Sequence, residues 1–127
     1  MISFILPVYN CYGSLIKGLP PLIKKLENLP EPYEIIIVDD GSPDKSDVTH
    51  VINSHCILLD NEKNYGKGYS VKKGMLHASG ENMIFMDGDF PFDLDVVELS
   101  YKELKKPGVD MIIGDRSLSD SDDEHVK

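Results

Sequence analysis

The sequence has only two cysteines and no long apolar run. These features argue against a cysteine metal site and against a membrane-spanning helix. Cys11 and Cys56 lack the paired spacing of a metal site, and isolated thiols among apolar neighbours are typical of a reducing compartment. The longest aliphatic run is Ile35–Val38, far short of the ~20 residues of a membrane-spanning helix. The opening MISFILPVYN has no basic region and contains Pro7, unlike a signal peptide. We therefore expect no membrane span and a cytoplasmic location.

Basic residues are also in short supply, with 13 Lys and Arg against 22 Asp and Glu, giving a net charge of −9. This balance repels nucleic acid and anionic membranes as non-specific partners. It does not exclude a phosphorylated ligand, because a metal ion can lie between carboxylates and phosphate. The 127 residues suit one domain. Because acids crowd the C-terminal end, we predict a domain over residues 1–117 and an acidic, disordered tail over 118–127.

Short apolar segments alternate with helical patterns along the chain. The predicted strands are Ile2–Val8, Tyr33–Val38, Cys56–Leu59, Met83–Met86 and Met111–Ile113. Helical periodicity predicts helices over residues 15–26, 47–53, 66–80 and 95–104, the first kinked by, or beginning at, Pro20 and Pro21. Strands that alternate with helices predict an α/β fold, with a mostly parallel sheet covered on both faces.

Polar and acidic residues follow each predicted strand. They are Tyr9-Asn10, Asp39-Asp40-Gly41-Ser42, the segment 61–68, Asp87-Gly88-Asp89 and Asp115-Arg116. In a parallel sheet these positions share one edge, where ligands of such folds bind. We therefore expect the functional site at the carboxyl edge of the sheet.

The acidic residues at this edge permit two interpretations each. Asp87 and Asp89 are hard oxygen donors that suit Mg²⁺ or Mn²⁺ bound to phosphates, or else they cap the following helix. Asp39 and Asp40 can accept hydrogen bonds from a base or sugar, but at least one of them is expected to fix the turn that follows. Tyr9 either stacks on a base or packs at the strand end.

Two basic residues complete the candidate edge. Lys67 lies between Gly66 and Gly68 at a predicted helix start, where backbone N–H groups can bind a phosphate or sugar, although glycine there can also serve the turn alone. Arg116 offers a guanidinium for a diphosphate, or forms a surface ion pair.

With these segments in order, the chain resembles the nucleotide-sugar half of a family 2 glycosyltransferase of the GT-A fold. The matching segments are FILPVYN, EIIIVDDGSPD, NYGKGYSVKKGM, MDGD and IIGDRS. The glycine-lysine-glycine segment and the Gly-Asp-Arg ending are most similar to the branch that transfers sugars to polyprenyl or dolichyl phosphates. The resemblance implies a three-layer GT-A domain that ends before the acceptor half, and a place in cell wall or glycolipid biosynthesis.

The resemblance also implies a role for each site residue. Pro7 and Tyr9 line the nucleobase pocket, Asp39 contacts the base, and Asp40 supports the loop or ribose. Asp87 lies near the ribose and the metal, Asp89 binds Mg²⁺ or Mn²⁺, and Lys67 and Arg116 face the phosphates or sugar. The implied reaction is inverting, from a UDP- or GDP-sugar to an acceptor such as a polyprenyl phosphate, at the inner face of a membrane that the chain contacts peripherally.

The sequence departs from the family pattern at Cys11, where an acidic residue is frequent, and at Pro91, where a glutamine is frequent. No general base can be named, although an anionic lipid phosphate needs none. Two other readings stay open: a non-catalytic nucleotide-sugar-binding domain or a fragment that needs a second chain, and, more remotely, a phosphoacceptor receiver domain. In the receiver reading the acidic pair should follow the first strand, whereas here it follows the second.

Overall fold

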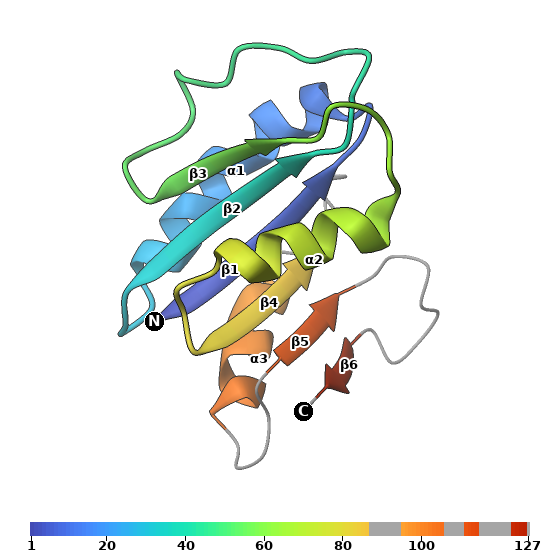
Figure 1. Ribbon diagram of the computed structural model, residues 1–127. Coiled ribbons are helices and arrows are strands. Elements are labelled where there is room, and N and C mark those ends of the chain that lie inside the picture. The colour runs from blue at the N-terminus through green and yellow to red at the C-terminus, as the bar shows by residue number, and fades with distance from the viewer. Residues whose placement is uncertain (87–94, 106–110, 115–122, 127) are drawn as a thin grey trace.

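The computed structural model describes residues 1–86, 95–105, 111–114 and 123–126, which form a sheet with helices on both faces (Figure 1). The strands are β1 (Ile2–Val8), β2 (Tyr33–Asp39), β3 (Cys56–Asp60), β4 (Asn82–Met86), β5 (Met111–Gly114) and β6 (Asp123–Val126). The helices are α1 (Tyr12–Glu27), α2 (Lys67–His77) and α3 (Asp95–Leu104). All five predicted strands are thus confirmed to within one residue at either end.

The strands lie in the order β3-β2-β1-β4-β5-β6, and all neighbours pair in parallel except β5 and β6. The chain moves outward through β2 and β3, then returns through α2 to place β4 beside β1. The order therefore reverses between β1 and β4, which is where ligands of open α/β sheets bind. This three-layer, mostly parallel sheet confirms the predicted fold class. The receiver alternative is wrong, because that fold places its third strand, and not its fourth, beside the first.

Helices α1 and α3 cover one face of the sheet and α2 covers the other (Figure 1). On the first face the buried side chains of α1, which include Leu15, Leu19, Leu22 and Leu26, pack on alternate residues of β1 and β2. On the second face, Val71 and Met75 of α2 pack against Ile5 and Val38. Because both faces are covered, β1 and β2 are buried along their whole length.

Two helix predictions need correction. Helix α1 begins at Tyr12, not at the prolines, and it continues through Pro20 and Pro21. Both prolines lie on the exposed side of the helix, so water can satisfy the carbonyls that lose their N–H partners.

The predicted helix over residues 47–53 is absent, and this segment forms turns. The Asp47 carboxylate accepts from the backbone N–H of Thr49 at 2.9 Å, and Asn53 Oδ1 accepts from that of His55 at 2.9 Å. Such local side-chain bonds compete with helical ones. Val48 anchors the segment in the core with 4% of its surface exposed.

Part of the expected tail over residues 118–127 belongs to the sheet. β6 pairs antiparallel with β5, in a register that sets Met111 opposite Val126 and Gly114 opposite Asp123. The backbone groups of these four residues pair along β5.

Candidate functional site

The carboxyl end of β1 carries the first two candidate residues. Pro7 is buried and pairs in register with Val38 of β2. The described pairing between β1 and β4 runs only from Ile2 to Ile5, so the missing N–H of Pro7 interrupts no bond of that ladder. Tyr9 follows the strand with 50% of its surface exposed, which leaves its ring accessible at the edge.

Asp39 ends β2 and is 4% exposed. Its Oδ1 accepts the backbone N–H of Ser42 at 2.8 Å, which fixes the turn, and its Oδ2 accepts the Tyr12 hydroxyl at 2.7 Å. Burial and then the Asp39 carboxylate raise the pKa of Tyr12 well above its ordinary value, so the phenol stays a donor. Each Asp39 oxygen can accept more than one bond, so the carboxylate keeps acceptor capacity for a ligand.

Asp40, also 4% exposed, joins the segment after β3 to the edge. Its Oδ1 accepts Asn61 Nδ2 at 2.9 Å and the Tyr65 N–H at 2.8 Å, and its Oδ2 accepts the Gly66 N–H at 2.9 Å. Gly66 is the N-cap of α2, so this carboxylate lies at the positive end of the helix dipole. Asp40 therefore connects the end of β2 to the loop that leads into α2.

The loops after β1, β2 and β3 are held together at this edge. Ser42 Oγ accepts the N–H of Asn10 at 3.1 Å, which links the first two loops. Gly41 has φ of +72°, and a Cβ there would come within 2.7 Å of the Asn64 backbone nitrogen, so the second and third loops are in contact. Only glycine combines this positive φ with this close approach.

Lys67 is the first residue of α2 and is exposed. Of the backbone groups expected to bind a phosphate here, the Gly66 N–H is already used by Asp40. Helix α2 begins at the edge where the parallel strands end (Figure 1). Lys67 therefore starts its helix at the edge where Asp39 ends β2 and Tyr9 follows β1.

Two residues of this edge have contacts that the sequence did not predict, although Asn61 begins the segment 61–68 that is expected there. Tyr12 orients Asp39, and Asn61 donates to both Asp40 and Ser70 Oγ, the latter at 2.9 Å. Tyr12 could have been found, because its spacing to Leu15 continues the buried stripe of α1. Asn61 carried the weaker signal of an amide directly after a predicted strand.

A cavity of about 220 Å³ borders Asp39 on the side of Tyr12. Val48 and Leu58 give it apolar walls, and Asp60 lies on its rim, where Lys45 Nζ donates to Asp60 Oδ1 at 2.7 Å. That hydrogen bond raises the pKa of Lys45. The cavity is smaller than the roughly 300–1,000 Å³ of typical ligand pockets, so it suits part of a ligand, such as a ring, more than a whole nucleotide.

Three predicted site residues, Asp87, Asp89 and Arg116, lie outside the described residues. Among the residues that the structure does describe, no three His, Cys, Asp or Glu side chains gather in a way that could hold a metal ion. β4 ends at Met86 beside β1, and Asp87 is the next residue in the chain.

The sequence profile described as glycosyl transferase family 2 matches residues 3–127. One curated relative is the undecaprenyl-phosphate 4-deoxy-4-formamido-L-arabinose transferase of Proteus mirabilis, 34% identical over 93 residues, covering 69% of this chain and 28% of that protein. Another is the dolichyl-phosphate beta-glucosyltransferase ALG5D of Trichomonas vaginalis, 32% identical over 134 residues, covering 94% of this chain and 40% of that protein. The chain therefore spans well under half the length of either relative.

Solved structures share the fold. A mannosyltransferase of Pyrobaculum calidifontis, in complex with GDP-Man and Mn²⁺, superposes with a TM-score of 0.67 at 22% identity, over 85% of this chain and 33% of that one. The TarS 1-349 structure from S. aureus in complex with UDP-GlcNAc gives a TM-score of 0.56 at 21% identity, over 81% and 30%. The three-layer architecture is thus that of the GT-A glycosyltransferases.

Proposed function

The chain belongs to glycosyl transferase family 2, and on this premise we propose that it is the nucleotide-sugar-binding part of an inverting, metal-dependent glycosyltransferase. The donor is a UDP- or GDP-sugar and the acceptor a polyprenyl phosphate. The two curated relatives support this acceptor, since their names specify undecaprenyl phosphate and dolichyl phosphate. A cytoplasmic location at the inner face of the membrane stays a prediction from the sequence.

One observation carries the proposal: Tyr9, Asp39 and the start of α2 at Lys67 share the carboxyl edge of the sheet, next to the switch between β1 and β4. An exposed aromatic ring, a buried carboxylate with acceptor capacity and a lysine are groups that a base, a ribose and a diphosphate require. Asp40 binds none of these directly in our proposal; it holds the loop that presents Lys67.

The proposed roles follow this arrangement. Pro7 and Tyr9 contact the nucleobase, and Asp39 accepts a hydrogen bond from it. Lys67 and Arg116 face the diphosphate or the sugar. The acceptor phosphate oxygen forms a bond to the anomeric carbon while the bond from that carbon to the diphosphate oxygen breaks, so configuration inverts. Because the phosphate nucleophile is already anionic, this step requires no general base from the chain.

The donor set of Asp87 and Asp89 fits Mg²⁺ or Mn²⁺, because both are hard carboxylate ligands that follow β4 directly. A divalent ion bound there supplies positive charge that stabilises the departing nucleoside diphosphate. The Mn²⁺ in the Pyrobaculum mannosyltransferase supports this cofactor by similarity of fold.

Calorimetric titration tests the proposal. UDP- and GDP-sugars are titrated into the chain with and without Mn²⁺, and at least one donor is expected to bind in a metal-dependent manner. Asp89→Ala is expected to abolish the metal dependence. Asp39→Asn is expected to weaken binding at least tenfold while folding normally, because Asn Oδ1 still accepts from Ser42 and its amide can donate to the Tyr12 oxygen. Glu81→Gln, exposed at the opposite edge, is the matched charge control.

Metal-independent binding that is unchanged in Asp89→Ala would overturn the metal assignment, and the absence of binding by any donor would overturn the site. A turnover assay distinguishes the proposed enzyme from the alternative, which is a non-catalytic nucleotide-sugar-binding domain or a part that needs a second chain. Donor and polyprenyl phosphate are incubated with the chain, and release of nucleoside diphosphate without transfer to lipid, or no release at all, favours the alternative.

A further inference from the structure

The outer face of α2 displays large side chains that the fold leaves in solvent. Tyr65, just before the helix, is 41% exposed, Tyr69 is 50% exposed and Leu76 is 76% exposed. The two tyrosine rings lie 4.6 Å apart between centroids, and Lys63 Nζ lies 5.4 Å from the Tyr65 centroid. Apolar area of this kind on a surface helix indicates an interaction surface when it is continuous.

The exposed side chains of α2 form one row, because residues 69, 72 and 76 follow at helical steps of three and four. Tyr65 precedes the helix and joins this row through the contact of its ring with that of Tyr69. We call Tyr65, Tyr69, Lys72 and Leu76 the outer stripe. The opposite side of α2 carries the buried residues Ser70 and Gly74, so the outer stripe faces directly away from the sheet.

The charge of this region is opposite to that of the chain. Between residues 61 and 80 there are four lysines and one acid, Glu62, within a chain of net charge −9. Helix α2 itself holds three lysines and no acid. Lys63, Lys67 and Lys72 are exposed, whereas Lys73 donates to the Asp60 carbonyl at 2.8 Å. Charges beyond the Debye length of about 8 Å are screened at physiological salt, so the local lysines decide which partner this face attracts.

The chemistry of the outer stripe matches the surface of an anionic membrane. Tyrosine has an apolar ring and a polar hydroxyl and prefers the headgroup boundary, leucine inserts among the acyl chains, and lysine binds lipid phosphates. Stable protein interfaces have a packed apolar centre. Two tyrosines and one leucine form only a narrow row with less apolar area than such a centre, which favours a membrane over a protein as the partner.

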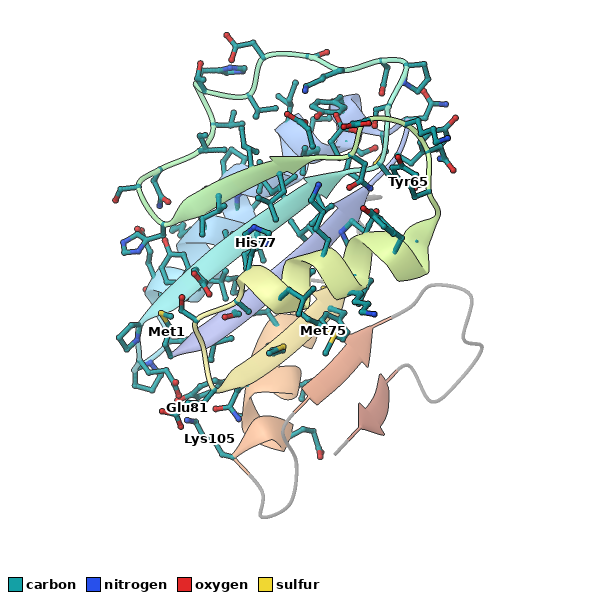
Figure 2. All side chains as sticks on the ribbon, in the orientation of Figure 1. Met1, Tyr65, Met75, His77, Glu81 and Lys105 are labelled. Atoms are coloured by element: carbon teal, nitrogen blue, oxygen red, sulfur yellow. The ribbon has the colours of Figure 1, made fainter. Side chains whose placement is uncertain are left out.

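The direction of α2 gives this face a role. The helix begins at the carboxyl edge with Gly66 and Lys67, so a membrane along its outer face reaches the candidate site at one end. Figure 2 shows Tyr65 at the site end of α2 and His77 toward the other end. A lipid-borne phosphate acceptor would enter from this side.

We propose that the outer stripe of α2 docks the chain onto the headgroup region of an anionic membrane. The inference deepens the proposed function and rests on it for the identity of the acceptor, while the docking itself requires no transfer reaction. Among the described residues no helix is long and apolar enough to cross a bilayer, so the attachment proposed is peripheral.

Co-sedimentation with vesicles tests the docking. The chain is expected to bind vesicles of phosphatidylcholine with phosphatidylserine, to bind pure phosphatidylcholine at least tenfold more weakly, and to be released by high salt. Lys72→Glu is expected to weaken binding about tenfold, because each lysine contributes through the surface potential. Leu76→Ser is expected to weaken it severalfold through lost insertion. Lys17→Glu, exposed on α1 at the other face of the sheet, makes the same change in net charge and is expected to have little effect.

An equal loss of vesicle binding in Lys72→Glu and Lys17→Glu would overturn the proposal, since the net charge of the chain alone would then explain the binding. Stripe-dependent self-association without vesicle binding, seen by sedimentation velocity, would also overturn it and make this face a protein interface. The donor titration is run on the same variants and is expected to be unchanged in Lys72→Glu and Leu76→Ser. Failure of donor binding with intact vesicle binding overturns the proposed function alone, and the reverse overturns only the docking.

Discussion

Both edges of the sheet contain buried carboxylates. The carboxylates of the two edges differ in how many hydrogen bonds they accept and in how many loops these bonds connect. At the carboxyl edge, Asp39 and Asp40 use both of their oxygens to connect three loops. At the amino edge, Glu34 is 8% exposed, and its Oε2 accepts both the Ser3 hydroxyl at 2.6 Å and the Ser79 N–H at 2.7 Å.

The surroundings of the two edges also differ. Figure 2 places Met1, Glu81 and Lys105 together at the amino edge and Tyr65 at the other end of the molecule. The Glu81 N–H donates to the Met1 carbonyl at 3.2 Å, and the Met1 ammonium lies 3.2 Å from Glu31 Oε2. The amino edge is therefore closed by contacts within the chain, whereas the carboxyl edge combines carboxylates with an exposed Tyr9, a cavity and a helix start. Similar buried groups thus close one edge, whereas at the other they hold three loops beside an exposed ring and a cavity.

The largest expected effect comes from replacing each carboxylate by its amide. Asp40→Asn puts an NH₂ group against either the Gly66 N–H or the Tyr65 N–H, so one donor loses its acceptor, and we expect a loss of about 3 kcal/mol in unfolding free energy. Glu34→Gln keeps one carbonyl oxygen for Ser3 and Ser79, and we expect a loss below about 1 kcal/mol. Urea denaturation measures both variants. Equal losses would show that the two edges use their carboxylates in the same way.

The next effect comes from the two crowded glycines, one at each edge. A Cβ at Gly41 would lie 2.7 Å from the Asn64 nitrogen, and one at Gly80 would lie 2.7 Å from the Met1 carbonyl oxygen. Both alanine variants are expected to lose about 2 kcal/mol of stability. Only Gly41→Ala is expected to weaken donor binding as well, since it displaces the loop that precedes Lys67. Gly13→Ala, where nothing lies within 4 Å, is the control.

The smallest effect is a pH dependence at the amino edge. Burial opposes ionisation of Glu31, but Lys105 and the Met1 ammonium outweigh it and hold the pKa of Glu31 below its usual value. A depressed pKa means that this carboxylate stabilises the fold above its ordinary pKa of about 4.3 and that the stabilisation is lost as pH falls through the lower folded value.

We expect the loss from this partly exposed group to stay below about 1 kcal/mol. Denaturation midpoints of wild type and Glu31→Gln, compared from neutral to acidic pH, should converge at low pH. A constant difference at every pH would assign the effect of the substitution to packing.

Most of the fold could be read from the chain because its signals are local. The apolar segments of β1 and β2 and the periodicity of α3 depend on neighbouring residues, and the alternation of strands and helices indicates a parallel sheet. The predictions failed where side-chain hydrogen bonds or tertiary packing overrode the helical pattern. The segment 47–53 has helical spacing, yet its Asx turns and the burial of Val48 hold it in a non-helical path. Helix α1 passes through its prolines because tertiary packing of its leucine stripe outweighs two lost hydrogen bonds.

Among the described residues, the sequence by itself determined that Tyr9, Asp39 and Asp40 reach the carboxyl edge, since the parallel strands end there and these residues end or directly follow them. Only the tertiary structure decided what Asp39 and Asp40 do at that edge. Their partners Tyr12, Asn61 and Gly66 lie up to 27 residues away in the chain. A hydrogen bond depends on distance in space, and the sheet order that creates this proximity has no local signal in the sequence. For the same reason the outer stripe of α2 emerged only once its other side was seen to face the sheet.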